Sequence, residues 1–211
     1  MIIIDLIYNL SVLVALSVLS GFIDSRYDRK TFAGKIWQGL LFGAVAIIGM
    51  LYPFNFVEGI IFDGRSIVIS LCTLFFGPLA GLISSILAII FRIYLGGGGA
   101  LTGSLVITAS YLIGAYYFKL RGNNKIVLTK TNLYLFGMFT SIAMMVLMLT
   151  LPSSSILNAY KTISFSVMLT YPIITLVIGK ILLDQEENKN SLEKIKREET
   201  LLRTTLYSIG D

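Results

Sequence analysis

The sequence predicts an all-α membrane protein: five full spans plus a broken, re-entrant helical hairpin, about six hydrophobic segments, followed by a cytoplasmic signalling helix. Hydrophobic residues make up 55% of the 211 residues and charged residues only 14%, whereas soluble domains carry about a quarter charged residues. The mean hydropathy is +0.82. The apolar residues also fall in runs near the ~20 residues that cross a ~30 Å hydrocarbon core. So few charges cannot cover a water-facing surface, which excludes a soluble fold.

Six apolar stretches account for the predicted helices: Ile2–Ile23, Trp37–Leu51, Ile67–Leu95, Ala100–Phe118, Leu133–Leu151 and Ile163–Leu183. The first stretch begins without a basic n-region and has no clear small-x-small cleavage site before its charged end. We therefore expect a retained spanning helix there and not a cleaved signal peptide.

Basic residues gather in three segments beside these stretches: Arg26–Lys35, Lys119–Lys130 and Lys180–Arg203. Among the 17 basic residues only Arg65, Arg92 and Lys161 lie elsewhere. The positive-inside rule places all three segments in the cytoplasm, so the net charge of +5 reflects membrane topology and not nucleic-acid binding. Six full crossings would put the second segment and the tail outside. One apolar stretch must therefore enter and leave on the same face.

The stretch from 66 to 95 is the best candidate for this re-entrant element, because as one helix it would run ~45 Å. Gly77-Pro78 lies in its middle, and a proline removes a backbone donor and clashes with the preceding turn. A hairpin broken there leaves the N-terminus outside and the C-terminus in the cytoplasm; a single long tilted span is the alternative. Irregular backbone at this depth needs protein or a water-filled cavity around it, so we expect a cavity.

The composition becomes charged and helix-favouring from Leu183 onward, which divides the chain into a transmembrane domain at 1–183 and a helix at 184–206. A heptad frame gives this helix a weak seam in which five of eight core positions are apolar: Ile181, Asn188, Ile195 and Leu202 at one position, and Gln185, Leu192, Glu199 and Leu206 at the other. A short dimeric coiled coil fits this pattern, because polar core residues can set its register. The alternative is an amphipathic helix lying on solvent or on another domain.

Arg65 and Arg92 border the broken stretch. An intramembrane arginine costs ~2.5–3.5 kcal/mol on insertion scales, so such a residue indicates a function. Guanidinium groups can hold a carboxylate with two parallel hydrogen bonds. Four glycines at 96–99 then expose backbone N–H groups before a helix N-terminus, which favours anions. The alternative is structural: Arg65 pairs with Asp63 or Glu58, Arg92 reaches lipid headgroups, and the glycines form a flexible turn.

Three motifs resemble a known family: Asp63-Gly64-Arg65, Phe75-Phe76-Gly77-Pro78-Leu79-Ala80-Gly81-Leu82 and Arg92-Ile93-Tyr94-Leu95-Gly96-Gly97. They resemble the signature of the LytS-type five-transmembrane sensor domains, and the resemblance covers about residues 1–183. That family has an Asn-x-Arg motif where this chain has Asp63-Gly64-Arg65, which keeps the arginine and changes its polar neighbour. Residues 207–211 resemble the opening of a PAS domain, cut where its first strand would start.

The resemblance implies the membrane sensor half of a signalling receptor. Family members carry histidine kinase or diguanylate cyclase outputs, often through PAS domains, and we expect a sensor histidine kinase first. Some members are linked to small carboxylates such as pyruvate, which makes the two arginines carboxylate anchors. The expected ligand-binding residues are Arg65, Arg92, Asp63, Gly97, Gly98, Thr102, Ser104 and Thr108.

The residue inventory argues against other classes of function. The chain has no histidine and a single cysteine, Cys72, so we expect no metal, no cofactor and no catalytic residues within these 211 residues. A transporter or substrate-capture subunit for a small organic anion is the alternative function, because broken helices also build transport sites. We expect a multi-pass plasma-membrane protein. Its expected partners are a small organic acid, the lipid bilayer and a second copy through the C-terminal helix, without nucleic acid.

Overall fold

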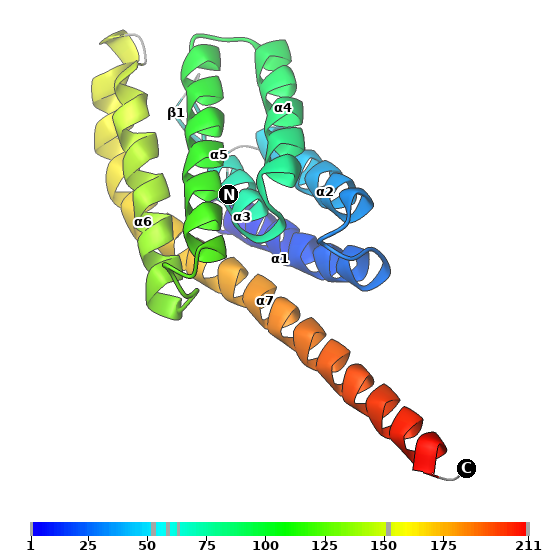
Figure 1. Cartoon of the computed structure of the whole chain (residues 1–211). Helices are drawn as coiled ribbons and strands as arrows, with labels where there is room; N and C mark the ends of the chain where they lie inside the picture. The colour runs from blue at the N-terminus through cyan, green and yellow to red at the C-terminus, as the bar shows by residue number, and fades with distance from the viewer. Residues whose placement is uncertain (1, 52–53, 58–59, 63, 151–152, 210–211) are drawn as a thin grey trace.

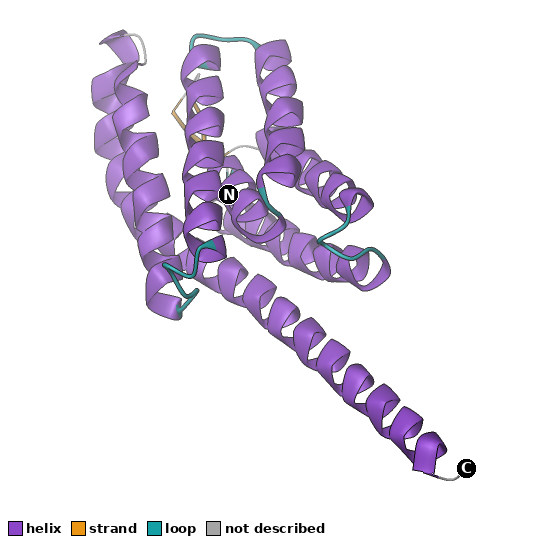
Figure 2. Ribbon diagram, viewed as in Figure 1, coloured by secondary structure: helices purple, strands orange, loops and turns teal. Residues whose placement is uncertain are grey.

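The structure is a computed structural model that describes the backbone of residues 2–51, 54–57, 60–62, 64–150 and 153–209, and the side chains of residues 11–51, 64–150 and 167–205. Its elements in chain order are α1 (Ile2–Arg26), α2 (Phe32–Leu51), β1 (Phe54–Val57), β2 (Ile60–Phe62), α3 (Arg65–Phe76), α4 (Pro78–Leu95), α5 (Ala100–Gly122), α6 (Lys130–Leu147), a 3-10 turn (Met148–Thr150) and α7 (Ser153–Ile209). Helices make up nearly all of the described chain, joined by short loops (Figures 1 and 2).

Five helices of the described chain are long and apolar enough to cross a membrane: α2, α4, α5, α6 with its 3-10 turn, and α7 from residue 167. A further helix, α1, has 25 residues. The chain is therefore a multi-pass membrane protein, and the predicted all-α membrane fold is confirmed. The small antiparallel hairpin β1–β2, which pairs Phe54 with Phe62 and Val57 with Ile60, was not predicted.

The predicted break at Gly77-Pro78 separates α3 from α4. Helix α3 ends at Phe76, and Gly77 has a φ of +89°, a conformation that side chains other than glycine rarely adopt. Pro78 is the first residue of α4, where its missing N–H would have no helical partner in any case. The two residues thus end one helix and begin the next.

After this break the chain turns back on itself. Near the break, Thr73 of α3 packs against Gly81 of α4 and Gly114 of α5. At the far ends of the same helices, the side chains of Arg65 and Arg92 both reach Gly103 of α5. Helices α3 and α4 therefore run antiparallel, which confirms the hairpin and rules out a single long span.

Helix α3 is the centre of the bundle. All 12 of its residues are buried, and α2, α4, α5, α6 and α7 each pack against it. The hydroxyl groups of Ser70 and Thr73 donate to the carbonyls of Ile67 and Ile69 in the same helix, which satisfies them in this apolar surrounding. At about 18 Å, α3 is too short to cross the hydrocarbon core. It is instead an inner rod that runs from Arg65 to the break.

The two ends of the bundle differ in composition. One, which we call the basic end, holds the α1–α2 loop, the end of α5 and the stretch of α7 near Glu186, since Arg29 and Arg121 both pair with that residue. The other, the glycine end, holds the loop from Gly96 to Gly99 between α4 and α5 (Figure 1). The three basic segments therefore lie at the same end of the bundle, as the positive-inside argument requires.

The last span and the charged tail form one continuous helix. Helix α7 runs beside α6 and then continues away from the bundle toward the C-terminus (Figure 1). The sequence boundary between 183 and 184 falls inside this helix and does not interrupt it.

Candidate functional site

Arg65 and Arg92 come from the two far ends of the broken hairpin. Arg65 is the first residue of α3, and Arg92 lies in the last turn of α4. Both are buried, with 6% and 3% of their surface exposed. Nη1 of Arg92 donates a hydrogen bond of 2.8 Å to the carbonyl oxygen of Gly96, which directs this side chain inward along the glycine loop.

The two arginines converge on one point of α5. A Cβ atom placed on Gly103 would lie 2.6 Å from Nε of Arg92 and 3.1 Å from Nη2 of Arg65. Any larger residue at this position would displace at least one guanidinium group. Two cations brought to one point repel each other, and an anion between them converts this repulsion into attraction. The geometry is therefore suited to a small oxyanion.

Thr102 lies beside this point and is buried as well. Its hydroxyl group shares a 2.8 Å hydrogen bond with the hydroxyl of Thr150 after α6. Because Thr150 also donates to the carbonyl of Leu147 at 2.7 Å, Thr102 acts as the donor between the two hydroxyls. This bond joins α5 to the end of α6 at the level of the arginines.

The remaining predicted residues lie at different distances from this centre. Gly97 and Gly98 are exposed in the loop, and Gly97 has a φ of +85° and accepts a hydrogen bond from the N–H of Ala100. The Ser104 hydroxyl donates to the carbonyl of Ala100 at 3.0 Å, on a half-buried part of α5. These residues shape the turn and the start of α5 next to the arginines.

Thr108 lies away from the arginines on the exposed side of α5. Its hydroxyl group donates to the carbonyl of Ser104 at 2.9 Å. Five residues separate it from Gly103, which places the two about 140° apart around the helix. Asp63 and Glu58, the acidic residues of the structural alternative, lie outside the described residues. Arg92 points to Gly96 and Gly103, not outward to headgroups.

Gly103 and Thr150 were not among the predicted site residues. Gly103, Ser110 and Gly114 are small residues on one buried side of α5, and such residues in a span indicate a close approach of another helix. That pattern could have marked Gly103 as the contact point for the hairpin. Thr150 has no comparable signal, since its role depends on how α6 ends beside α5.

The site at Gly103 is built from two guanidinium groups, a hydroxyl and backbone. Among the described residues, no group of three or more His, Cys, Asp or Glu side chains could hold a metal ion. Arginine stays protonated over the physiological range and does not serve as a general acid or base. The pair therefore presents charged hydrogen-bond donors and no acceptor.

Comparison with known proteins agrees with the fold and the motifs. A family model described as 5TMR of 5TMR-LYT matches residues 16–185, from the middle of α1 to the charged part of α7. No curated protein and no solved structure matches the chain. The family is a sensor domain and not a catalytic one, so these residues are the transmembrane sensory domain of a signalling receptor. The chain belongs to the family of LytS-type five-transmembrane sensor domains.

Proposed function

We propose that this sensory domain binds a small carboxylate such as pyruvate between Arg65 and Arg92, and that α7 relays binding to a cytoplasmic output. The observation that supports this most directly is the convergence of the two buried arginines at Gly103. One carboxylate can accept hydrogen bonds from both guanidinium groups. Since the arginines come from α3 and α4, a ligand between them would change how the two arms of the hairpin sit relative to each other.

Such a ligand transmits a signal only if it binds one conformation more tightly than another. We infer that the cytoplasmic output is a sensor histidine kinase, with a diguanylate cyclase as the second candidate, and that a PAS domain connects it to α7. The positive-inside rule supports an outside N-terminus and a cytoplasmic basic end. The protein would then lie in the plasma membrane with its glycine end facing out.

The proposed signalling helix at 184–206 would pair with that of a second copy. Its seam residues Leu192, Ile195 and Leu202 are 60%, 60% and 65% exposed. Apolar residues left at heptad spacing on one side of a helix favour a coiled-coil partner. Charged residues beside the seam would form ion pairs with those of the second copy and would favour a parallel arrangement of the two helices.

A transporter for a small organic anion remains the second candidate, because broken helices also form transport sites. The continuity of α7 from the last span into a charged tail favours the receptor. Deleting residues 190–211 separates the two functions. Uptake of the anion into vesicles would survive in a transporter, whereas signalling in the full receptor would be lost.

Ligand binding is tested by thermal unfolding of the purified chain in nanodiscs with pyruvate and a panel of mono- and dicarboxylates. Arg65→Gln and Arg92→Gln should each raise the dissociation constant about tenfold or more, since a charge-assisted hydrogen bond contributes about 1.5–3 kcal/mol. Arg26→Gln, an exposed arginine at the end of α1, is the matched control and should bind like the parent. If folded parent protein responds to no carboxylate, or if both site variants respond as the parent does, the carboxylate site is wrong.

A further inference from the structure

The charged part of α7 is held by a group of ion pairs at the basic end. Glu186 is the central residue: its Oε1 accepts a 2.7 Å hydrogen bond from Nη2 of Arg121, and its Oε2 lies 2.9 Å from Nη1 of Arg29. Arg121 belongs to the last turn of α5, and Arg29 to the loop between α1 and α2. One carboxylate of the output helix thus joins two separate parts of the sensor bundle.

Both of these arginines also lie over the end of α3. The guanidinium of Arg29 is 5.4 Å from the ring centre of Phe76, and that of Arg121 is 5.8 Å from the ring centre of Phe75. Cations at this distance from an aromatic face are attracted to it, so the rings position the two guanidinium groups. Phe75 and Phe76 are the last residues of α3, directly before the break at Gly77-Pro78. Any movement of the end of α3 therefore reaches both partners of Glu186.

The same helix begins at the candidate ligand site. Arg65 is the first residue of α3, and all residues between it and Phe76 are buried and helical. A single regular helix of this length is stiff, so a shift at Arg65 moves Phe75 and Phe76 with it. The break behind Phe76 separates this rod from α4, because the proline cannot continue the hydrogen-bond ladder. The candidate ligand site and the ion pairs of Glu186 therefore lie at the two ends of one rigid helix, α3.

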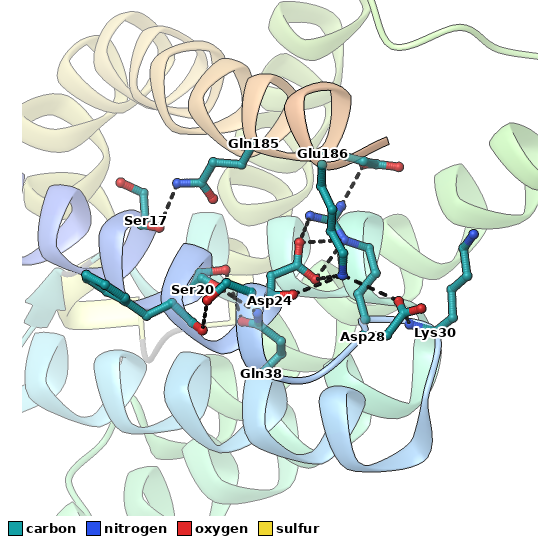
Figure 3. Close-up of polar contacts among 12 residues, drawn as sticks. Ser17, Ser20, Asp24, Asp28, Lys30, Gln38, Gln185 and Glu186 are labelled. Carbon is teal, nitrogen blue, oxygen red and sulfur yellow. Dashed lines mark hydrogen bonds and ion pairs between the residues drawn. The ribbon is translucent and has the colours of Figure 1, made fainter. Parts of the chain in front are cut away.

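Further contacts fasten the same stretch of α7 to α1. Gln185 donates from Nε2 to the carbonyl of Ser17 at 3.0 Å, and Nζ of Lys189 donates to the carbonyl of Asp24 at 2.9 Å. The Asp24 carboxylate accepts from Nε of Arg29 at 3.0 Å and lies 3.2 Å from Nζ of Lys189. Figure 3 shows Gln185 and Glu186 above Ser17 and Asp24. Arg29 is therefore shared between a fixed carboxylate on α1 and the carboxylate on α7.

We propose that Arg29 and Arg121 hold Glu186 in place through their ion pairs, and that Phe75 and Phe76 set the positions of these two arginines. In this way α3 controls the position of α7. We call the two arginines and Glu186 the clamp. The proposal that the clamp relays binding of a carboxylate at Arg65 and Arg92 rests on the function proposed above. The proposal that the clamp links α3 to α7 does not depend on that function. Glu186, Arg29 and Arg121 are positioning residues, because they act through α7 and lie at the opposite end of the bundle from the ligand.

The link between α3 and α7 is tested without ligand by a distance measurement across the basic end. Spin labels at Asn190→Cys on α7 and Asn123→Cys after α5 occupy exposed positions, and Cys72 is buried. Glu186→Gln removes the ion pairs with little change in shape and should lengthen and broaden the distance distribution. Phe76→Leu should also lengthen and broaden the distance distribution. The double variant Glu186→Gln/Phe76→Leu should differ little from either single variant. Glu187→Gln, the exposed neighbouring carboxylate, is the matched control and should leave the distribution unchanged.

The relay is tested by titrating pyruvate into the same labelled proteins in nanodiscs. In the parent, pyruvate should change the label distance, and Glu186→Gln should abolish this change. Because coupling is reciprocal, Glu186→Gln should also change the dissociation constant for pyruvate by about fivefold or more, whereas Glu187→Gln should not. Arg121→Lys keeps the charge and should restore part of the response relative to Arg121→Gln.

The outcomes separate the two proposals. If pyruvate binds and the label distance in Glu186→Gln still responds as in the parent, the clamp is not the relay, while the ligand site stands. If Phe76→Leu leaves α7 in place although Glu186→Gln releases it, α3 does not control the clamp. If the parent binds no carboxylate, the ligand site fails, and the ligand-free comparison of Glu186→Gln with Phe76→Leu still decides whether α3 positions α7.

Discussion

Two pairs of arginines lie at opposite ends of the same buried helix, and they are surrounded differently. At the basic end, Arg29 and Arg121 meet the carboxylates of Asp24 and Glu186, which the chain supplies from α1 and α7. At the glycine end, Arg65 and Arg92 meet at the bare backbone of Gly103. The first pair holds parts of the protein together. The second brings two cations to one point on α5.

This difference explains how one helix can serve two roles. Ion pairs between partly buried groups are specific in geometry, and losing one partner is costly because a charge is left behind. The ion pairs at the basic end therefore hold α7 in one defined position. On the function proposed above, the glycine end would provide the input, since an anion there would change the electrostatic balance between the two cations. Three substitutions or conditions test this contrast, in order of decreasing effect.

Asp24→Asn should have the largest effect on stability. Asp24 is 5% exposed and pairs with both Arg29 and Lys189. Removing its charge leaves Arg29 with Glu186 alone and Lys189 with the exposed Asp28, and should cost about 3 kcal/mol, the lower limit for breaking a buried ion pair. Denaturant titration in detergent micelles measures the free energy of unfolding. Hydrogen exchange should show lost protection near Gln185, and an unchanged exchange rate there would contradict the role assigned to Asp24.

Gly103→Ala should have a smaller effect on stability and a specific effect on binding. The new Cβ would lie 2.6 Å from Nε of Arg92, so the guanidinium group must move. Overpacking of this kind costs about 1–3 kcal/mol. We expect the affinity for carboxylates, measured by thermal unfolding, to fall about tenfold or more, because the two guanidinium groups could no longer reach the same point.

The control for this substitution is Gly122→Ala at the end of α5, where a Cβ would meet nothing within 4 Å. This variant should bind and unfold like the parent. If Gly103→Ala binds carboxylates as well as Gly122→Ala does, the ligand does not lie between the two arginines. The glycine end of α3 would then not be the ligand-binding end of the bundle.

The fold was predictable because its signals are local. A proline after glycine in the middle of an apolar stretch indicates a break wherever it occurs. Basic residues beside apolar stretches report the side of the membrane without any knowledge of packing. Together they implied the hairpin, and the hairpin in turn implied that Arg65 and Arg92 would lie at the same level. The structure confirms the hairpin, and it brings the two arginines to one residue of α5.

The clamp at the basic end was not predictable in the same way. Arg29 and Arg121 entered the sequence analysis only as part of two basic segments that indicate topology, and no sequence signal singled out Glu186. Their pairing depends on how the α1–α2 loop, α5 and α7 come together, which involves separations of 65 residues and more. Thr108 shows the opposite case. Its place on the exposed side of α5 follows from helical periodicity, which the grouping of Thr102, Ser104 and Thr108 as one set did not use.

Acidification should have the smallest effect, through Asp28 in the α1–α2 loop. The backbone N–H of Lys30 donates to the Asp28 carboxylate at 3.0 Å and, with the nearby Lys189 ammonium at 3.6 Å, holds the pKa of this carboxyl below its usual value of 3.8. A carboxyl group with a lowered pKa in the folded state contributes stability that is fully present above the unfolded pKa. That contribution is lost as the pH falls through the folded pKa.

The contact between Asp28 and Lys189 should therefore hold unchanged between about pH 5 and pH 8 and weaken only in stronger acid. Because Asp28 is largely exposed, Asp28→Asn should cost less than about 1 kcal/mol, well below the cost of Asp24→Asn, and high salt should reduce even this difference. Unfolding titrations of both variants at two salt concentrations measure this. An Asp28→Asn effect as large as that of Asp24→Asn would mean that α7 is held from the exposed loop, and that the buried carboxylate at the end of α1 is not its main anchor.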